Sequence, residues 1–180
     1  MMKRREMMAE KDTSDLTGFI KAMQAASARQ ILQLGVVDEA FVLAVLEQQQ
    51  SPKPLHLHCV ASHDLTEAAK FDSLISNIDI GDDIEIVLTK HLGSETEIND
   101  EVLSIAEASP FDAIFISGSS SAEALLTALM VGNESLKPGG ILGIARRLID
   151  DRAMETAISS FLEMYGDIYD QPGGELLVKK

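Results

Sequence analysis

The chain has 180 residues, which suits one domain with its own core, and 46% apolar with 24% charged residues are the proportions of a folded globular protein. Asp and Glu number 29 against 15 Lys and Arg, so the formal net charge is -14. This charge repels phosphate backbones and anionic lipid headgroups, so we expect no nucleic-acid partner and no membrane partner.

The number of cysteines and the length of the apolar runs indicate the cellular compartment of the protein. Cys59 is the single cysteine, so the chain can form neither an internal disulfide nor a thiolate zinc site. The sequence contains no run of about 18 apolar residues, and none follows the charged N-terminus. We therefore expect a cytoplasmic protein, with residues 1–12 as a disordered leader and residues 13–180 as a single domain.

Hydrophobic periodicity predicts the elements in chain order. Apolar residues at helical spacing predict an amphipathic helix over residues 13–29, packed on a core that spans residues 30–180. The strands predicted in this core cover residues 31–34, 55–60, 84–88, 113–116 and 141–144. The helices predicted between and after them cover residues 39–49, 64–74, 98–108, 122–136 and 150–165.

The end of the chain follows a different pattern. Two short apolar runs, at residues 168–169 and 176–178, flank Pro172-Gly173-Gly174 and predict an antiparallel hairpin. The strict strand and helix alternation before it predicts parallel strands joined by right-handed crossovers. The predicted fold class is therefore α/β, with a seven-stranded, mostly parallel sheet, helices on both faces and a C-terminal antiparallel hairpin.

Three segments carry a family resemblance. Gly35 ends the first strand, Phe-Asp-Ala-Ile-Phe-Ile-Ser-Gly at residues 111–118 leads into a helix, and Leu-Lys-Pro-Gly-Gly-Ile-Leu at residues 136–142 opens the fifth strand. With the closing hairpin, these segments resemble the class I S-adenosylmethionine-dependent methyltransferases, and most of all their small O-methyltransferases. The resemblance implies a Rossmann-like fold, S-adenosylmethionine as cofactor and a small-molecule acceptor for its methyl group.

The resemblance also implies a cofactor site at the carboxyl ends of the strands, where the strand order of such sheets reverses. Carried over residue by residue, the positions that would contact the cofactor are Gln33, Gly35, Val37, Val60, Ala61, Lys90, His91, Ser117 and Gly118.

Several positions depart from the family pattern. Gln33 stands where the family has an acidic residue, and Val37 and Glu39 stand where it has glycines. Val60 occupies the place of the carboxylate that accepts the ribose hydroxyls, and Lys90 that of an acidic residue near the adenine. Because the ribose acceptor alone contributes on the order of 1–3 kcal/mol, we expect weak cofactor binding, with a dissociation constant of roughly 0.1 mM or higher.

No metal site is expected. Metal-dependent O-methyltransferases hold a divalent cation with an Asp after the fourth strand and an Asp-Asn pair after the fifth. Ser117 and the pair Arg146-Arg147 stand there instead, and guanidinium groups repel a cation. His56 and His58 share one face of a strand, but no further ligand has matching spacing.

Several residues have two interpretations. His63 and His91 are candidate bases for an acceptor hydroxyl, or else surface histidines of loops. The serines in residues 117–121 could form an anion cradle or a helix cap. Arg146 and Arg147 could bind a carboxylate or form ion pairs with the aspartates at 150 and 151.

Two functions from different classes follow. The first is methyl transfer to a small molecule, in which the sulfonium supplies the chemistry and the protein supplies orientation. The second is a noncatalytic binding or assembly module that keeps the fold. A nicotinamide-dependent dehydrogenase is disfavoured because the chain lacks G-x-G-x-x-G. The N-terminal helix, the serine-rich loop or the second subunit of a homodimer could close the acceptor site.

Overall fold

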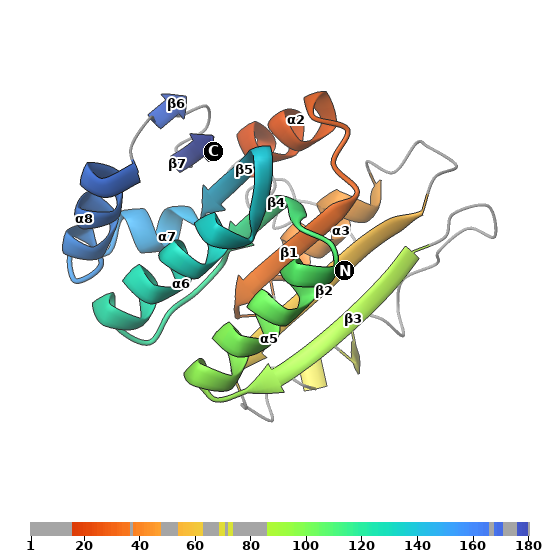
Figure 1. The fold of residues 1–180 in the computed structure, drawn as a ribbon, viewed down its shortest axis with the longest axis horizontal. Coiled ribbons are helices and arrows are strands. Elements are labelled where there is room, and N and C mark those ends of the chain that lie inside the picture. Colours follow the sequence, from red (N-terminus) through yellow and green to blue (C-terminus); the bar gives the residue numbers. More distant parts are fainter. Residues whose placement is uncertain are drawn as a thin grey trace, which may run out of the picture.

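A computed structural model describes residues 16–36, 38–47, 54–62, 69, 70, 72, 73, 86–165, 168–170 and 176–179 (Figure 1). The helices are α2 (Thr17–Ala25), α3 (Glu39–Glu47), α5 (Glu95–Ala108), α6 (Ala122–Ser135), α7 (Arg146–Ile149) and α8 (Glu155–Tyr165). The strands are β1 (Gln30–Gly35), β2 (Leu55–Ser62), β3 (Ile86–Gly93), β4 (Phe111–Ile116), β5 (Leu136–Ile144), β6 (Ile168–Asp170) and β7 (Leu176–Lys179).

The strands form one sheet in the order β3-β2-β1-β4-β5-β7-β6. The five strands from β3 to β5 pair in parallel, and β7 pairs antiparallel with both β5 and β6. The predicted α/β Rossmann-like fold with a parallel sheet is confirmed. The Pro172-Gly173-Gly174 turn and the leader at residues 1–12 lie outside the described residues.

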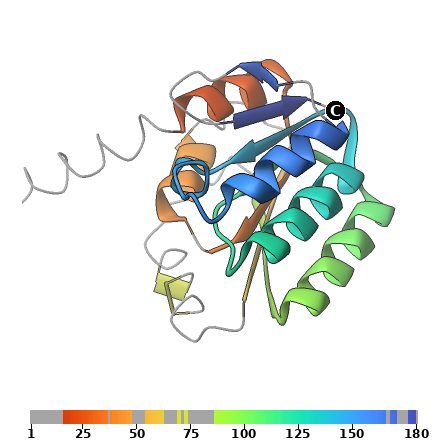
Figure 2. The same ribbon diagram turned by 90° about the vertical axis from the view of Figure 1, so that its left-hand side faces the viewer.

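Helices cover both faces of the sheet, as Figure 2 shows, with α5, α6 and α8 on one side and α2 and α3 on the other. Alternate residues of β1 divide between the two cores, because successive side chains of a strand point to opposite faces. Leu32 and Leu34 pack in the α5, α6 and α8 core, whereas Ile31 packs in the α2 and α3 core. β4 is buried along its whole length, as expected for a central parallel strand.

The N-terminal helix is shorter than predicted. α2 spans Thr17–Ala25 and ends four residues before the predicted end at residue 29, and it packs through Phe19 against the rings of Phe41 and Phe115. Phe19 also lies directly on Gly143 of β5, where an added Cβ would approach its ring carbon Cδ2 to 2.3 Å. The helix is thus fixed to the sheet face opposite α6.

The start of β4 is joined to the start of β1 by one buried carboxylate. Asp112 Oδ2 accepts hydrogen bonds from the backbone N–H groups of Arg29 and Gln30, both at 2.8 Å. Lys137, at the start of β5, forms an ion pair with the other oxygen, Oδ1. Asp112 therefore links three neighbouring strands at the amino edge of the sheet, far along the strands from their carboxyl ends.

Among the described residues, no helix combines the length and apolar character needed to cross a membrane.

Candidate functional site

The strand order reverses between β1 and β4, which lie side by side in the sheet. The chain leaves β1 towards α3 on one face and leaves β4 towards α6 on the other. Because the two connections diverge, a crevice opens at the carboxyl ends of these strands, which is where open α/β sheets bind ligands.

Two glycines bring the loops after β1 and β4 into backbone contact. Gly35 has a φ of +115°, and a Cβ there would lie 2.2 Å from the carbonyl oxygen of Gly118. A Cβ on Gly118 would lie 2.8 Å from Cγ2 of Val36. Neither position can carry a side chain without moving its neighbour, so the glycines are required by close approach and, at Gly35, by the backbone conformation.

A buried polar network holds the turn after β1. The Ser117 hydroxyl lies 2.5 Å from the carbonyl oxygen of Val36, and the Gln33 side-chain amide donates to the same oxygen at 3.3 Å. The Cys59 thiol donates to Gln33 Oε1 at 3.4 Å. Burial raises the pKa of Cys59 from 9.0 to about 12, so the thiol stays protonated and can donate at neutral pH.

The two arginines after β5 have different partners. Arg146 pairs with Asp150 through Nε and Oδ2 at 3.1 Å, which is the surface ion pair expected one turn along a helix. Arg147 instead donates from Nε to the carbonyl oxygen of Ser117 at 2.7 Å, and its Nη2 donates to the same oxygen. Arg147 therefore holds the end of β4 from the side opposite the β1 turn.

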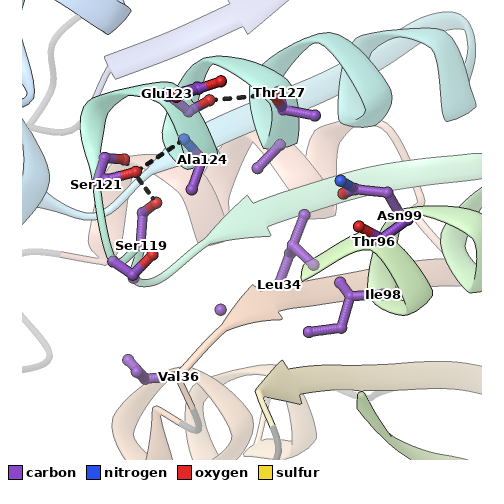
Figure 3. Close-up of a pocket in the computed structure, with 14 residues that line it drawn as sticks. Leu34, Val36, Thr96, Ile98, Asn99, Ser119, Ser121, Glu123, Ala124 and Thr127 are labelled. Atoms are coloured by element: carbon purple, nitrogen blue, oxygen red, sulfur yellow. Dashed lines mark hydrogen bonds between the residues drawn. The ribbon is translucent and has the colours of Figure 1, made fainter. Parts of the chain in front are cut away.

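A pocket of about 410 Å³ opens beside these loops, between the first turns of α5 and α6 (Figure 3). Its lining residues are Leu34, Gly35, Val36, Thr96, Ile98, Asn99, Gly118, Ser119, Ser120, Ser121, Glu123, Ala124, Thr127 and Ala128. Glu123 is the one charged side chain among them, and the others are apolar or neutral polar groups. Such a lining suits a neutral or cationic ligand with an apolar body and several hydroxyl or amino groups.

The serine-rich loop caps α6 and also borders the pocket. The Ser121 hydroxyl accepts from the backbone N–H of Ala124 at 3.1 Å, and the Ser119 hydroxyl donates to the Ser121 carbonyl at 3.0 Å. Both serines stand at the pocket rim in Figure 3. The cap and the pocket wall are therefore the same segment, and the two interpretations of this loop do not exclude each other.

No protein-family model matches the sequence, and no curated protein matches it. Solved structures do match. The O-methyltransferase TomG from Streptomyces achromogenes, in complex with S-adenosylmethionine, is 14% identical with a TM-score of 0.62, over 91% of this chain and 76% of that one. An O-methyltransferase from Bacillus cereus, in complex with S-adenosylhomocysteine, is 16% identical with a TM-score of 0.62, over 94% of this chain and 81% of that one. The chain has the fold of these O-methyltransferases.

In this methyltransferase fold, four of the predicted cofactor positions lie at or under the β1 and β4 ends. Gly35 and Gly118 line the pocket, and Ser117 joins the two loops beneath it. Gln33 is 1% exposed and supports the turn from the α3 side, so it reaches the pocket only through the backbone of Val36.

The remaining predicted positions do not line this pocket or lie outside the described residues. Val60 and Ala61 are each 2% exposed, and Val60 belongs to the core between the sheet and α5 and α6. β2 runs on to Ser62, so Val60 lies inside the strand rather than at its end. Lys90 and His91 belong to β3, where they pair with Cys59 and Val60 of β2; their side chains are not described. Val37 and His63 lie outside the described residues.

The first turn of α5 contributes lining residues that the sequence does not predict, because the predicted helix begins three residues late. α5 begins at Glu95 rather than residue 98, and Ser94 and Glu97 form a capping box, with Ser94 N–H donating to Glu97 Oε2 at 2.8 Å. The Ser-x-x-Glu spacing in the sequence is a signal that would have placed this turn, with Thr96 and Asn99, at the carboxyl edge.

Histidine and carboxylate placement bears on metal binding. Among the described residues, no three His, Cys, Asp or Glu side chains gather as a metal-binding group. His58 is buried with its ring edge-on to Phe111, at a centroid distance of 5.7 Å. This placement is that of a packed strand residue.

Proposed function

We propose that this protein binds S-adenosylmethionine in the 410 Å³ pocket at the β1 and β4 ends and transfers its methyl group to a small-molecule acceptor. The observation that carries the proposal is the coincidence of that pocket with the switch point of a fold shared with O-methyltransferases solved in complex with S-adenosylmethionine or S-adenosylhomocysteine.

The lining residues fit the groups of the cofactor. Leu34, Ile98 and Ala128 offer an apolar wall for an adenine ring, and the hydroxyl and amide groups of Thr96 and Asn99 offer partners for polar atoms. Glu123 supplies a carboxylate acceptor, which the sequence lacks at Val60. We propose that Glu123 takes over the role of the missing ribose acceptor and that its charge favours a sulfonium cation nearby.

When bound, S-adenosylmethionine would supply a methyl group on a sulfonium: the acceptor oxygen would bond to the methyl carbon, the C–S electron pair would stay on sulfur, and the hydroxyl proton would pass to a base. The chain's own contribution is to orient the two reactants and exclude water. His63 and His91 remain the proposed bases for the proton, because His63 directly follows β2 and His91 lies two residues before the end of β3.

Calorimetric titration with S-adenosylmethionine and S-adenosylhomocysteine tests the proposal. The expected dissociation constant is roughly 0.1 mM or higher, because the residue types Val37, Glu39 and Lys90 do not match the glycines and the acidic residue of the family pattern. Thr127→Trp puts an indole at the pocket wall and should weaken binding at least about tenfold. Met130→Trp is the matched control, because Met130 is exposed on α6 and does not line the pocket; it should bind like the unmodified chain.

The possible results separate the candidate functions. Equal binding by both tryptophan variants would mean that the pocket is not the cofactor site. Binding without methyl transfer to any acceptor, or no binding at all, would favour the noncatalytic module.

A further inference from the structure

Arg147 lies at the same edge of the sheet as the pocket. α7 begins two residues after the last residue of β5, and β5 pairs with β4 up to the register pair Ile116 and Ile144. The backbone N–H of Ala145 donates to the carbonyl oxygen of Ile116 at 2.9 Å, which continues this pairing to the carboxyl ends. Arg147 is therefore placed next to the loop that follows β4.

The guanidinium of Arg147 is held in a fixed orientation by a neutral partner. Nε and Nη2 both donate to the carbonyl oxygen of Ser117, and the peptide that carries this oxygen continues into Gly118 of the pocket wall. A planar guanidinium has five N–H donors, so three remain after these two bonds. A two-point contact orders the group in advance and lowers the entropy lost when a ligand binds.

The charge of Arg147 has no carboxylate partner among the described residues, whereas its neighbour Arg146 pairs with Asp150. The segment at residues 146–152 holds three arginines against two aspartates, within a chain whose net charge is -14. An anionic ligand approaching this chain needs such a local cation. Arg147 is exposed and oriented, has no acidic partner among the described residues, and contacts the loop that continues into the pocket wall at Gly118, which suits bidentate binding of a carboxylate.

We infer that Arg147 binds a carboxylate of a ligand at this edge of the sheet. The inference rests on the proposed function and deepens it, because it names a chemical group that the ligands of this site carry. Two sources can supply that group, the methyl acceptor or the amino-acid end of the cofactor.

Binding of four probes to the full chain tests the inference and distinguishes the sources. S-adenosylhomocysteine carries a carboxylate, and 5′-methylthioadenosine lacks the amino-acid end. 3,4-Dihydroxybenzoate and catechol form the corresponding pair for an acceptor. Arg147→Met should weaken binding of one or both carboxylate probes about tenfold, which is the effect of losing a charge-assisted hydrogen bond.

Two variants serve as controls. Arg146→Met removes a neighbouring arginine that already has an acidic partner and should leave all four affinities within about twofold. Arg147→Lys keeps the charge but not the planar fork, so it should lose less affinity than Arg147→Met. A weaker binding of S-adenosylhomocysteine alone assigns the carboxylate to the cofactor, and a weaker binding of dihydroxybenzoate alone assigns it to the acceptor.

Three results would overturn the inference. In the first, the unmodified chain binds neither carboxylate probe. In the second, Arg147→Met binds both carboxylate probes as tightly as the unmodified chain does. In the third, Arg147→Met weakens binding of 5′-methylthioadenosine as much as binding of S-adenosylhomocysteine. The third result would mean that Arg147 acts only by holding the loop at Ser117. If the unmodified chain binds neither adenosine probe, the proposed function fails, while a loss of dihydroxybenzoate binding in Arg147→Met would still support the carboxylate site.

Discussion

At the scale of single residues, the contact between Gly35 and Gly118 is the tightest feature of the site. Gly35 and Gly139 both have positive φ, at +115° and +81°, but their surroundings differ. A Cβ on Gly35 would lie 2.2 Å from a backbone oxygen, whereas a Cβ on Gly139 would meet nothing within 4 Å. An alanine at Gly139 therefore meets only the conformational cost of a positive φ, whereas an alanine at Gly35 also meets the steric cost of close approach.

We expect Gly139→Ala to lower the free energy of unfolding by about 1 kcal/mol and Gly35→Ala to lower it by about 3 kcal/mol or more. The larger loss at Gly35 arises because backbone atoms of Gly118 must move. Urea unfolding followed by circular dichroism measures both. Equal losses for the two variants would show that the β1 and β4 loops do not pack as described.

Burial of the Cys59 thiol makes the stability of the protein depend on pH. Its pKa is raised to about 12 from 9.0, so the folded state binds the thiol proton more tightly than the unfolded state does. The resulting stability is fully present below pH 9 and is lost as the pH rises towards 12. Between pH 8 and pH 10, the unmodified chain should lose about 1 kcal/mol more than Cys59→Ala does, in urea unfolding at both pH values. Identical losses would indicate an exposed thiol.

The family-like segments of the sequence pointed to two residues that line the pocket, Gly35 and Gly118. Gly35 and Gly118 could be recognised because each ends a strand within a family-like segment. The role of Gln33 could not, because its amide bonds to Val36 and accepts from Cys59, which is 26 residues away in the chain. The position of Glu123 in the pocket lining was not predicted, because an acidic residue in the first turn of a helix is ordinarily explained by the helix dipole.

At the scale of elements, Asp112 connects β1, β4 and β5. Asp112→Ala removes an acceptor of two backbone N–H groups and should lower the free energy of unfolding by about 2–3 kcal/mol. Lys137→Met removes only a half-exposed partner and should cost less than about 1 kcal/mol. Chemical unfolding of both variants is the measurement. A larger loss for Lys137→Met would mean that the ion pair, and not the backbone contacts, stabilises this edge.

A helix or strand could be predicted where burial gives the sequence a hydrophobic period. The residues at which these elements begin and end were harder to predict. β4 is apolar on both faces and was recognised for that reason. β5 begins at Leu136, directly after α6, although Pro138-Gly139-Gly140 reads as a separate turn in the sequence. The pairing of β4 with β5 is irregular between Phe111 and Ala113, and this irregularity accommodates the turn-like residues inside a strand.

At the scale of the whole molecule, the alternation of strands and helices was enough to predict a parallel sheet, because crossovers have one hand and short connections. The pocket could not be predicted in the same way. Its walls come from the first turns of α5 and α6, and only the sheet order brings these next to the end of β1. The positions chosen by motif alone therefore do not include the wall that α5 contributes to the pocket.

The most direct test of the cofactor site is a titration of ¹⁵N-labelled protein with S-adenosylhomocysteine, followed by backbone amide chemical shifts. We expect saturable shifts that gather at residues 34–36, 96–99 and 118–124, with little change at the amino edge around Asp112. Saturable shifts gathered elsewhere in the molecule, or no shifts at millimolar ligand, would contradict the claim that this pocket binds S-adenosylmethionine.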